Sequence, residues 1–132
     1  MKDLIHKIIT SIKPYDILES AHIQDVRVWL SEDVEIFRIK KPDIPPKHLV
    51  SYFVLYDVKQ HKLLLIHHKK SGLLLPAGGH VEKNEHPADT VRREMQEELQ
   101  LQANFLYENP LFLTVTKTVN MLPVHTDVSL WY

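Results

Sequence analysis

Cysteine is absent from this chain of 132 residues. Its absence excludes disulfides, thiol catalysis and cysteine-ligated zinc, and it fits the reducing environment of the cytoplasm. The chain also lacks an excess of either charge, because 16 basic residues stand against 17 acidic ones and leave a net charge of −1. It therefore has no broad positive field of the kind that favours nucleic acid or a membrane surface.

Long apolar runs are missing as well. No stretch approaches the roughly 18 apolar residues of a membrane-spanning helix. The N-terminal sequence MKDLIHKIITSIK has too short and too interrupted an apolar segment for a signal peptide. We therefore expect a cytoplasmic protein with no membrane partner, and the length suits one domain.

Residues 1–46 are predicted to form a helical extension followed by a connector. Apolar residues recur at helical spacing over 4–12 and again over 17–30. Residues 34–39 are predicted to form a short strand. The segment KKPDIPP at 40–46 holds three prolines, which is typical of a stiff connector.

Residues 47–132 are predicted to form an α/β domain. Pro87 suits the first turn of a helix that runs to about Leu99, with Val91, Met95 and Leu99 facing the core. Short runs rich in β-formers predict the strands, with a hairpin or adjacent strands for the first two: 49–56, 63–67, 105–107, 111–119 and 128–132. Strands flanking one helix, with helices ahead of them, indicate an α/β sandwich.

Three glutamates lie close together in the short segment EMQEE: Glu94, Glu97 and Glu98. Residues three and four apart share a helix face, so these carboxylates converge. Like charges at this spacing cost a few tenths of a kcal/mol per pair in an isolated helix. A hard divalent cation removes this penalty, because Mg²⁺ is held by a few carboxylates together with substrate phosphates.

The surrounding residues resemble a family motif. Gly79, five residues, Glu85, seven residues and then Arg93 to Leu101 are similar to the Nudix box, G-x5-E-x7-R-E-U-x-E-E-x-G-U, where U is a bulky apolar residue. Eight of the nine fixed positions are met, and the exception is Gln100, where the family has glycine. The resemblance implies a Nudix-type α/β/α sandwich with a mixed sheet.

The resemblance also implies a metal-dependent hydrolase of a nucleoside diphosphate linked to another group, with a small-molecule nucleotide as substrate. Glu97 and Glu98 match metal-binding positions, and Glu94 matches a position that binds metal or helps to activate water. The carbonyl of Gly78 matches a frequent backbone ligand. Hard oxygen ligands of this kind suit Mg²⁺ or Mn²⁺.

Two further positions of the motif support the carboxylates. Arg93 is expected to orient a carboxylate, with Glu97 four residues on as the candidate partner. Glu85 is expected to tie the loop to the helix, although it could also approach a second metal. Gln100 must either adopt a strained conformation or end the helix differently, at a cost of roughly 1 kcal/mol.

The C-terminus stops within an apolar strand-like run, SLWY at 129–132. Members of the resembled family usually continue into another strand and a helix, and often carry one more glutamate there. We therefore expect the C-terminal part of the domain to be missing. Otherwise the exposed sheet edge would favour pairing with a second copy as a homodimer.

Outside the motif the residues allow several roles. None of the nine histidines shows a zinc spacing, and His80 and His125 are the best candidates for substrate contact. Lys69 and Lys70 are expected to lie in a solvated loop rather than to contact a substrate phosphate. Four aromatic residues lie on predicted strands, where about half should face the core and others could stack on a base: Tyr52, Phe53, Trp131 and Tyr132.

Three functions are compared. A hydrolase is favoured by the intact carboxylate set, with nucleoside triphosphate pyrophosphohydrolysis of the MutT type as the first candidate. The alternative is a catalytically inactive nucleotide-binding or regulatory domain of the same fold. An isoprenoid diphosphate isomerase of this fold is disfavoured, because as the family is known that chemistry uses an active-site cysteine.

Overall fold

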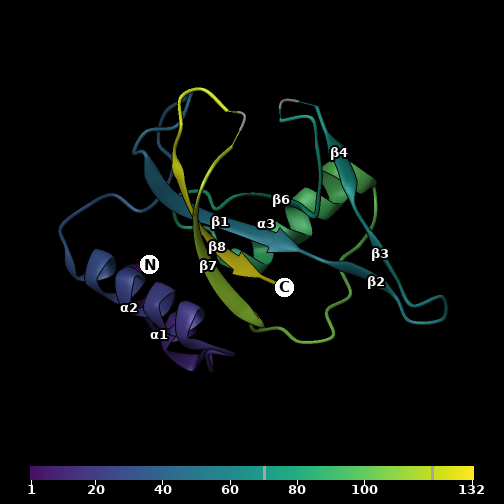
Figure 1. The fold of residues 1–132 in the computed structure, drawn as a ribbon, viewed down its shortest axis with the longest axis horizontal. Helices are drawn as coiled ribbons and strands as arrows, with labels where there is room; N and C mark the ends of the chain where they lie inside the picture. Colours follow the sequence, from purple (N-terminus) through teal and green to yellow (C-terminus); the bar gives the residue numbers. More distant parts are fainter. Residues whose placement is uncertain (70, 120) are drawn as a thin grey trace.

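A four-stranded mixed sheet lies at the centre of the computed structural model, which describes residues 1–69, 71–119 and 121–132 (Figure 1). Its strands are, in spatial order, β6 (Ala77–His80), β1 (Lys47–Phe53), β8 (Thr126–Trp131) and β7 (Phe112–Lys117). β1 pairs in parallel with β8, and the two outer pairs are antiparallel. The α/β class with a mixed sheet is therefore confirmed. β8, the strand in which the sequence ends, has a partner strand on each side, so it is not an exposed edge strand.

Two helices precede the sheet, as the apolar spacing predicts: α1 (Lys2–Ser11) and α2 (Ile17–Ser31). α2 begins after Asp16, whose carboxylate accepts a 2.7 Å hydrogen bond from the amide of Glu19. The side chain of Glu19 accepts one bond from the amide of Tyr15 and another, at 3.0 Å, from the amide of Leu113 in β7. The start of α2 is thereby joined to the outer strand of the sheet.

Two short hairpins leave the sheet between β1 and β6 and project away from α1 and α2 (Figure 1). One pairs β2 (Leu55–Asp57) with β3 (Lys62–Leu64), and the other pairs β4 (Ile66–His68) with β5 (Leu73–Leu75). Of the two runs predicted as a hairpin or adjacent strands, 49–56 and 63–67, only Leu55 and Tyr56 pair with Leu64 and Leu63. The rest of the first run belongs to β1, which pairs with β6 and β8.

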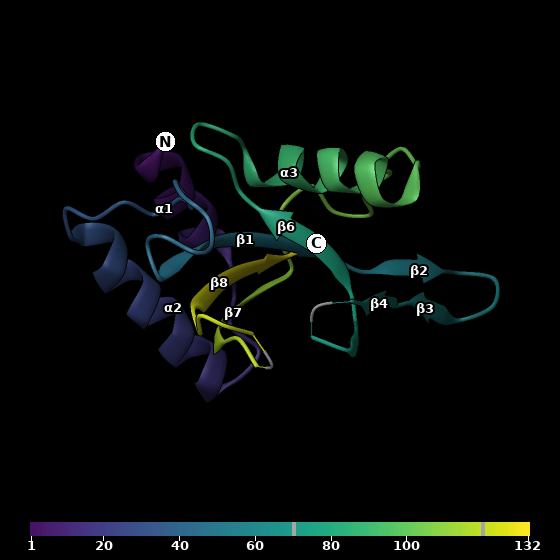
Figure 2. The same ribbon diagram turned by 90° about the horizontal axis from the view of Figure 1, so that it is seen from above.

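The third helix, α3 (Pro87–Glu94), lies along β6 and β1 on one face of the sheet (Figure 2). His86 caps it by accepting a hydrogen bond from the amide of Ala88, and Pro87 occupies the first turn. The helix continues as a π-helical turn, η1 (Met95–Leu99). Val91 and Met95 are buried and Leu99 packs beside them, as their spacing predicts.

Alternate residues of β1 face opposite ways. Leu49 packs into the larger core with α1 and α2, and Phe53 packs into the smaller core with α3. Val50 and Tyr52, which point the other way, line a cavity on the opposite face of the sheet. The helices thus cover one face, while the other face is available for a site.

Two predicted strands are wrong. Residues 34–39 form no strand. The carboxylate of Glu35 accepts hydrogen bonds from the amides of Ile36 and Phe37, so these amides do not pair with another strand. One hydrogen bond, from the amide of Leu49 to the carbonyl of Ile36, joins the segment to β1. Residues 105–107 are irregular as well. Within the part of the chain that the structure describes, no helix combines the length and the apolar character needed to cross a bilayer.

Candidate active site

Strand β6, which leads into the motif, requires glycine at two positions. A Cβ atom at Gly78 would lie 2.4 Å from the carbonyl oxygen of Ser51 and 2.6 Å from the Tyr52 ring. A Cβ atom at Gly79 would lie 1.9 Å from Oε1 of Glu94. Glycine at 79 therefore allows the Glu94 carboxylate to lie directly against the backbone of β6.

Arg93 connects the loop, the strand and the helix. Its guanidinium donates to both oxygens of Glu85, at 2.9 and 3.0 Å, and to Oε1 of Glu94 at 2.6 Å. It also donates to the carbonyl of His80 at 3.1 Å. Glu97, the partner expected from the sequence, is the most distant of these contacts at 3.7 Å. Arg93 is thus fixed by Glu85 and by the end of β6, and it holds Glu94 in place through a direct hydrogen bond.

Glu85 is held from several directions. Besides the two bonds from Arg93, it accepts a 3.0 Å hydrogen bond from the amide of Glu82 and a 2.8 Å bond from the hydroxyl of Thr90. Burial raises the pKa of this carboxyl, but these donors outweigh burial and leave the pKa below its ordinary value. Glu85 joins the loop to α3, as its place in the motif suggests.

The other carboxylates have different surroundings. The Glu94 side chain is 13% exposed and the Glu97 side chain is 59% exposed. Burial raises the pKa of Glu94, and the nearby charges of Glu98 and Glu97 raise it further, against the opposing effect of Arg93. Burial and the charge of Glu97 raise the pKa of Glu98. The three carboxylates therefore repel one another, as their spacing predicts.

The helix changes its winding within this group of carboxylates. The π-helical turn contains Glu97 and Glu98, and single π-turns inside helices are frequent at functional sites. Gln100 ends the turn in the left-handed conformation, with φ 56° and ψ 32°. Gln100 thus adopts the backbone conformation that glycine would adopt at lower cost.

Two cavities share His80, and the first of them adjoins the helix through Arg93 and Glu94. One, of about 460 Å³, is lined by residues that include Arg38, Lys83, Arg93 and Glu94. The other, of about 370 Å³, lies over Tyr52, Gly78 and Gly79 on the free face of the sheet. Tyr52 stacks on Trp131 at 5.0 Å between ring centroids, and Trp131 stacks on Phe112 at 5.2 Å. A flat substrate group could extend this aromatic stack.

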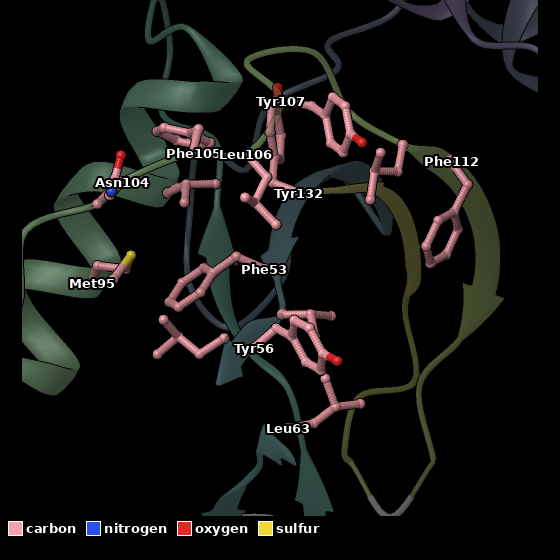
Figure 3. Close-up of a pocket in the computed structure, with 15 residues that line it drawn as sticks. Phe53, Tyr56, Leu63, Met95, Asn104, Phe105, Leu106, Tyr107, Phe112 and Tyr132 are labelled. Carbon is pink, nitrogen blue, oxygen red and sulfur yellow. The ribbon is translucent and has the colours of Figure 1, made fainter. Parts of the chain in front are cut away.

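A third cavity, of about 330 Å³, is apolar (Figure 3). Phe53, Met95, Phe105 and Tyr132 are among the residues that surround it, and Phe105 meets Tyr132 edge to face at 5.8 Å. Its lining includes none of the motif carboxylates. Of the four aromatic residues considered from the sequence, Phe53 and Tyr132 line this cavity, whereas Tyr52 lines the cavity beside Gly78.

Comparison with known proteins decides the family. Residues 46–132 match the NUDIX domain. The chain belongs to the NUDIX family. This match confirms the resemblance that was based on residues 79–101, and it extends that resemblance over the whole sheet.

One solved structure similar to this NUDIX chain is a hydrolase of the NUDIX family from Clostridium perfringens. The two share 27% sequence identity with a TM-score of 0.48, and the alignment covers 64% of this chain. The chain spans 66% of that protein, just under two thirds of its length. Among curated proteins, none matches the chain significantly.

The sequence did not predict that three histidines of this NUDIX domain lie close together. His80 lines both the cavity beside Arg93 and the cavity over Gly78, and His125 is buried. Together with Asp43 and His48 they form one cluster, whose members are far apart in the chain and therefore match no local zinc motif. Lys69 is exposed, and Lys70 lies outside the described residues.

Proposed function

We propose that this NUDIX domain is a metal-dependent hydrolase that cleaves the pyrophosphate linkage of a nucleoside diphosphate joined to another group. The observation that carries the proposal is the arrangement of Glu94, held by Arg93 against Gly79, beside the repelling carboxylates Glu97 and Glu98. A helix with no use for a cation could avoid this repulsion by exchanging one glutamate for lysine.

The donor set fits a hard divalent cation. Glu94, Glu97, Glu98 and the carbonyl of Gly78 would hold Mg²⁺ or Mn²⁺, which prefer oxygen ligands. The raised pKa values of Glu94 and Glu98 record an electrostatic cost that a bound cation relieves. When bound, the cation neutralises charge on the phosphate oxygens and on the attacking water.

The contacts of Arg93, Glu94 and Glu98 suggest a different role for each side chain. Arg93 is occupied by Glu85, Glu94 and a carbonyl, so it positions Glu94 rather than binding the substrate. Burial and the charge of Glu97 raise the pKa of Glu98. The pKa of Glu94 is raised as well, and Glu94 occupies the motif position that can help to activate water.

The cavity beside Gly78 supports a nucleotide as the substrate. Tyr52 borders the cavity and forms one end of the stack with Trp131, so a purine or pyrimidine ring can lie against aromatic carbon. Gly78 and Gly79 in β6 carry no side chain, so a phosphate group can approach the backbone closely. We take nucleoside triphosphates as the first substrate class to test.

The test measures phosphate and pyrophosphate release with and without Mg²⁺. The substrates are nucleoside triphosphates, dinucleoside polyphosphates, ADP-ribose and NADH. Glu97→Gln should lower Mg²⁺-dependent turnover at least about 100-fold with no loss of folding, because it removes one charged ligand. Glu108→Gln, which makes the same change at an exposed position, should behave as wild type.

Binding of Mn²⁺, followed by electron paramagnetic resonance, separates the hydrolase from an inactive binding domain. Turnover that persists in excess EDTA, or in Glu97→Gln, would contradict the assignment of the metal ligands. Metal binding without hydrolysis of any substrate class would instead select the inactive nucleotide-binding or regulatory domain.

A further inference from the structure

Four side chains gather at one end of the sheet, apart from the glutamates of the motif. They are Asp43 from the connector, His48 from β1, His80 from the end of β6 and His125, which directly precedes β8. One potential ligand atom from each lies within 4.8 Å of the others. The imidazole rings are also close, with 4.8 Å between the centroids of His48 and His80 and 5.1 Å between those of His48 and His125.

This cluster is largely inaccessible to solvent. The exposed fraction is 0% for the His48 side chain, 4% for His125 and 9% for Asp43. His80 retains 27% exposure and reaches the two cavities that share it. Buried polar side chains normally have partners, and each exception needs an explanation.

His48 shows such an exception. Its Nδ1 lies 2.8 Å from the carbonyl oxygen of Pro45, and a carbonyl can only accept, so Nδ1 carries the hydrogen. The side chain is fully buried, where a neutral imidazole costs less free energy than a charged one. Nε2 then presents a lone pair, makes no hydrogen bond and lies 3.7 Å from Oδ1 of Asp127. Two acceptors therefore face each other without a hydrogen between them.

The charges around the cluster do not balance. Asp43 and Asp127 carry carboxylates. Among the residues that the structure describes, the arginine or lysine within ion-pair distance of these carboxylates is Arg38, whose guanidinium lies 3.6 Å from Asp43. Tyr52 donates to the second oxygen of Asp127 at 3.5 Å. The Asp127 side chain is 10% exposed, so its charge is costly there without a partner. A bound cation would compensate both the excess negative charge and the lone pair of His48.

We propose that Asp43, His48, His80 and His125 form a binding site for a divalent transition-metal ion, with Zn²⁺ as the expected occupant. Three imidazoles and one carboxylate suit Zn²⁺, whereas Mg²⁺ and Ca²⁺ prefer oxygen ligands. The hydrogen bond from His48 to a backbone carbonyl is the outer-shell contact that commonly fixes the ring of a metal-bound histidine.

Two of the distances are close to those of a metal site. Tetrahedral Zn²⁺ with bonds of about 2.0–2.1 Å places its ligand atoms roughly 3.3–3.4 Å apart. Asp43 lies 3.5 Å from Nδ1 of His125 and 3.7 Å from Nε2 of His80. The full set of ligand atoms spans up to 4.8 Å, so binding requires an approach of up to roughly 1.5 Å, and Nδ1 of His125 exchanges its 3.4 Å contact with the carbonyl of Pro123 for the ion. Nε2 of His125, 3.3 Å from Asp127, then has a carboxylate as its outer-shell partner.

The proposed ion would connect the 40–46 connector to three strands of the sheet. It would also fix the end of β6, where the carbonyl of His80 accepts a bond from Arg93. The ligands of this site are mostly nitrogen atoms, whereas those of the glutamate site are oxygen atoms. By fixing His80, the ion would also fix the carbonyl to which Arg93 donates beside Glu94. The existence of this site does not depend on the proposed hydrolysis.

The test is the zinc content of the full chain, prepared without a histidine tag, reconstituted with Zn²⁺ and dialysed against excess Mg²⁺. We expect about one equivalent of Zn²⁺ in the wild type and in Glu97→Gln, and less than about 0.1 in His48→Ala and Asp43→Asn, since each removes a ligand. Asp43→Asn changes a connector residue with little change of shape, so it remains informative if His48→Ala does not fold. His6→Ala and His67→Ala, which alter exposed histidines, should load as wild type.

Co²⁺ substitution gives a second measurement, since tetrahedral Co²⁺ has a visible absorption that hexahydrated Co²⁺ lacks. This band should appear in the wild type and disappear in Asp43→Asn. A wild type that retains no Zn²⁺ would overturn the proposal. Zinc that is lost in Glu97→Gln but kept in His48→Ala or Asp43→Asn would assign the ion to the glutamates and would overturn it equally.

Discussion

Substituting Gly79 by alanine tests the geometry of the glutamate site most directly. The added Cβ would lie 1.9 Å from Oε1, 2.2 Å from Cδ and 2.8 Å from Cγ of Glu94. Ordinary van der Waals separation begins near 3.4 Å, so the carboxylate has to retreat by roughly 1.5 Å. That movement breaks its 2.6 Å contact with Arg93.

The size of the effect follows from two contributions. Overpacking in a well-packed region costs about 1–3 kcal/mol, and losing a hydrogen bond between charged groups costs about 1.5–3 kcal/mol. Because part of the strain is relieved when the bond breaks, we expect Gly79→Ala to lower the free energy of unfolding by about 2–4 kcal/mol. Urea denaturation of the metal-free protein measures this difference.

A double-mutant cycle separates the contact with Glu94 from other effects. Once Glu94→Ala has removed the carboxylate, Gly79→Ala should cost less than about 1 kcal/mol, which gives a coupling energy above about 1.5 kcal/mol. Gly72→Ala is the control. Gly72 has a φ of 71° with nothing within 4 Å of the added Cβ, so its cost of about 1 kcal/mol should not depend on Glu94. Equal costs of Gly79→Ala in both backgrounds would refute the reasoning.

Two further substitutions test the ends of the motif helix. Gln100→Gly should raise the free energy of unfolding, measured in urea, by about 0.5–1 kcal/mol, because glycine relieves the strain of the left-handed conformation at 100. Asn84→Gly should raise it less, because asparagine tolerates a φ of 68° better than glutamine tolerates its own. No gain at Gln100 would contradict this account. Glu85→Gln should cost about 1–3 kcal/mol at pH 7, because it weakens the bonds from Arg93. The pKa of Glu85 is lowered by folding, so its contribution is present above the ordinary value of 4.5 and is lost as pH falls through the folded value. The stability difference from wild type should therefore shrink below about pH 4.5, and a difference independent of pH would exclude ionisation of Glu85 as its source.

The local elements were predictable because their signals lie within a few residues. Apolar spacing located α1 and α2, and Pro87 located the start of α3. The motif placed Glu94, Glu97 and Glu98 on one helical segment, and their mutual repulsion follows from that spacing alone. Membership in the NUDIX family was accessible for the same reason, since the residues that indicate it span 79–101.

Local patterns misled where tertiary contacts decide. Residues 34–39 have the composition of a strand, but Glu35 accepts the amides that a neighbouring strand would have bonded. Arg93 was paired with Glu97 by spacing, yet Glu85 binds it more closely, because the loop that carries Glu85 folds back onto α3. In the first case a side chain within the segment accepts the backbone amides, and in the second a side chain from the preceding loop accepts the bonds of Arg93.

By itself the sequence determined the helices and the carboxylate motif, because each depends on residues that are neighbours in the chain. Only the tertiary structure decided the histidine cluster. Parallel pairing of β1 with β8 sets His48 opposite Asp127, and antiparallel pairing with β6 brings His80 beside them. Strand register joins residues that are tens of positions apart, and a pattern of local spacing carries no information about such pairings.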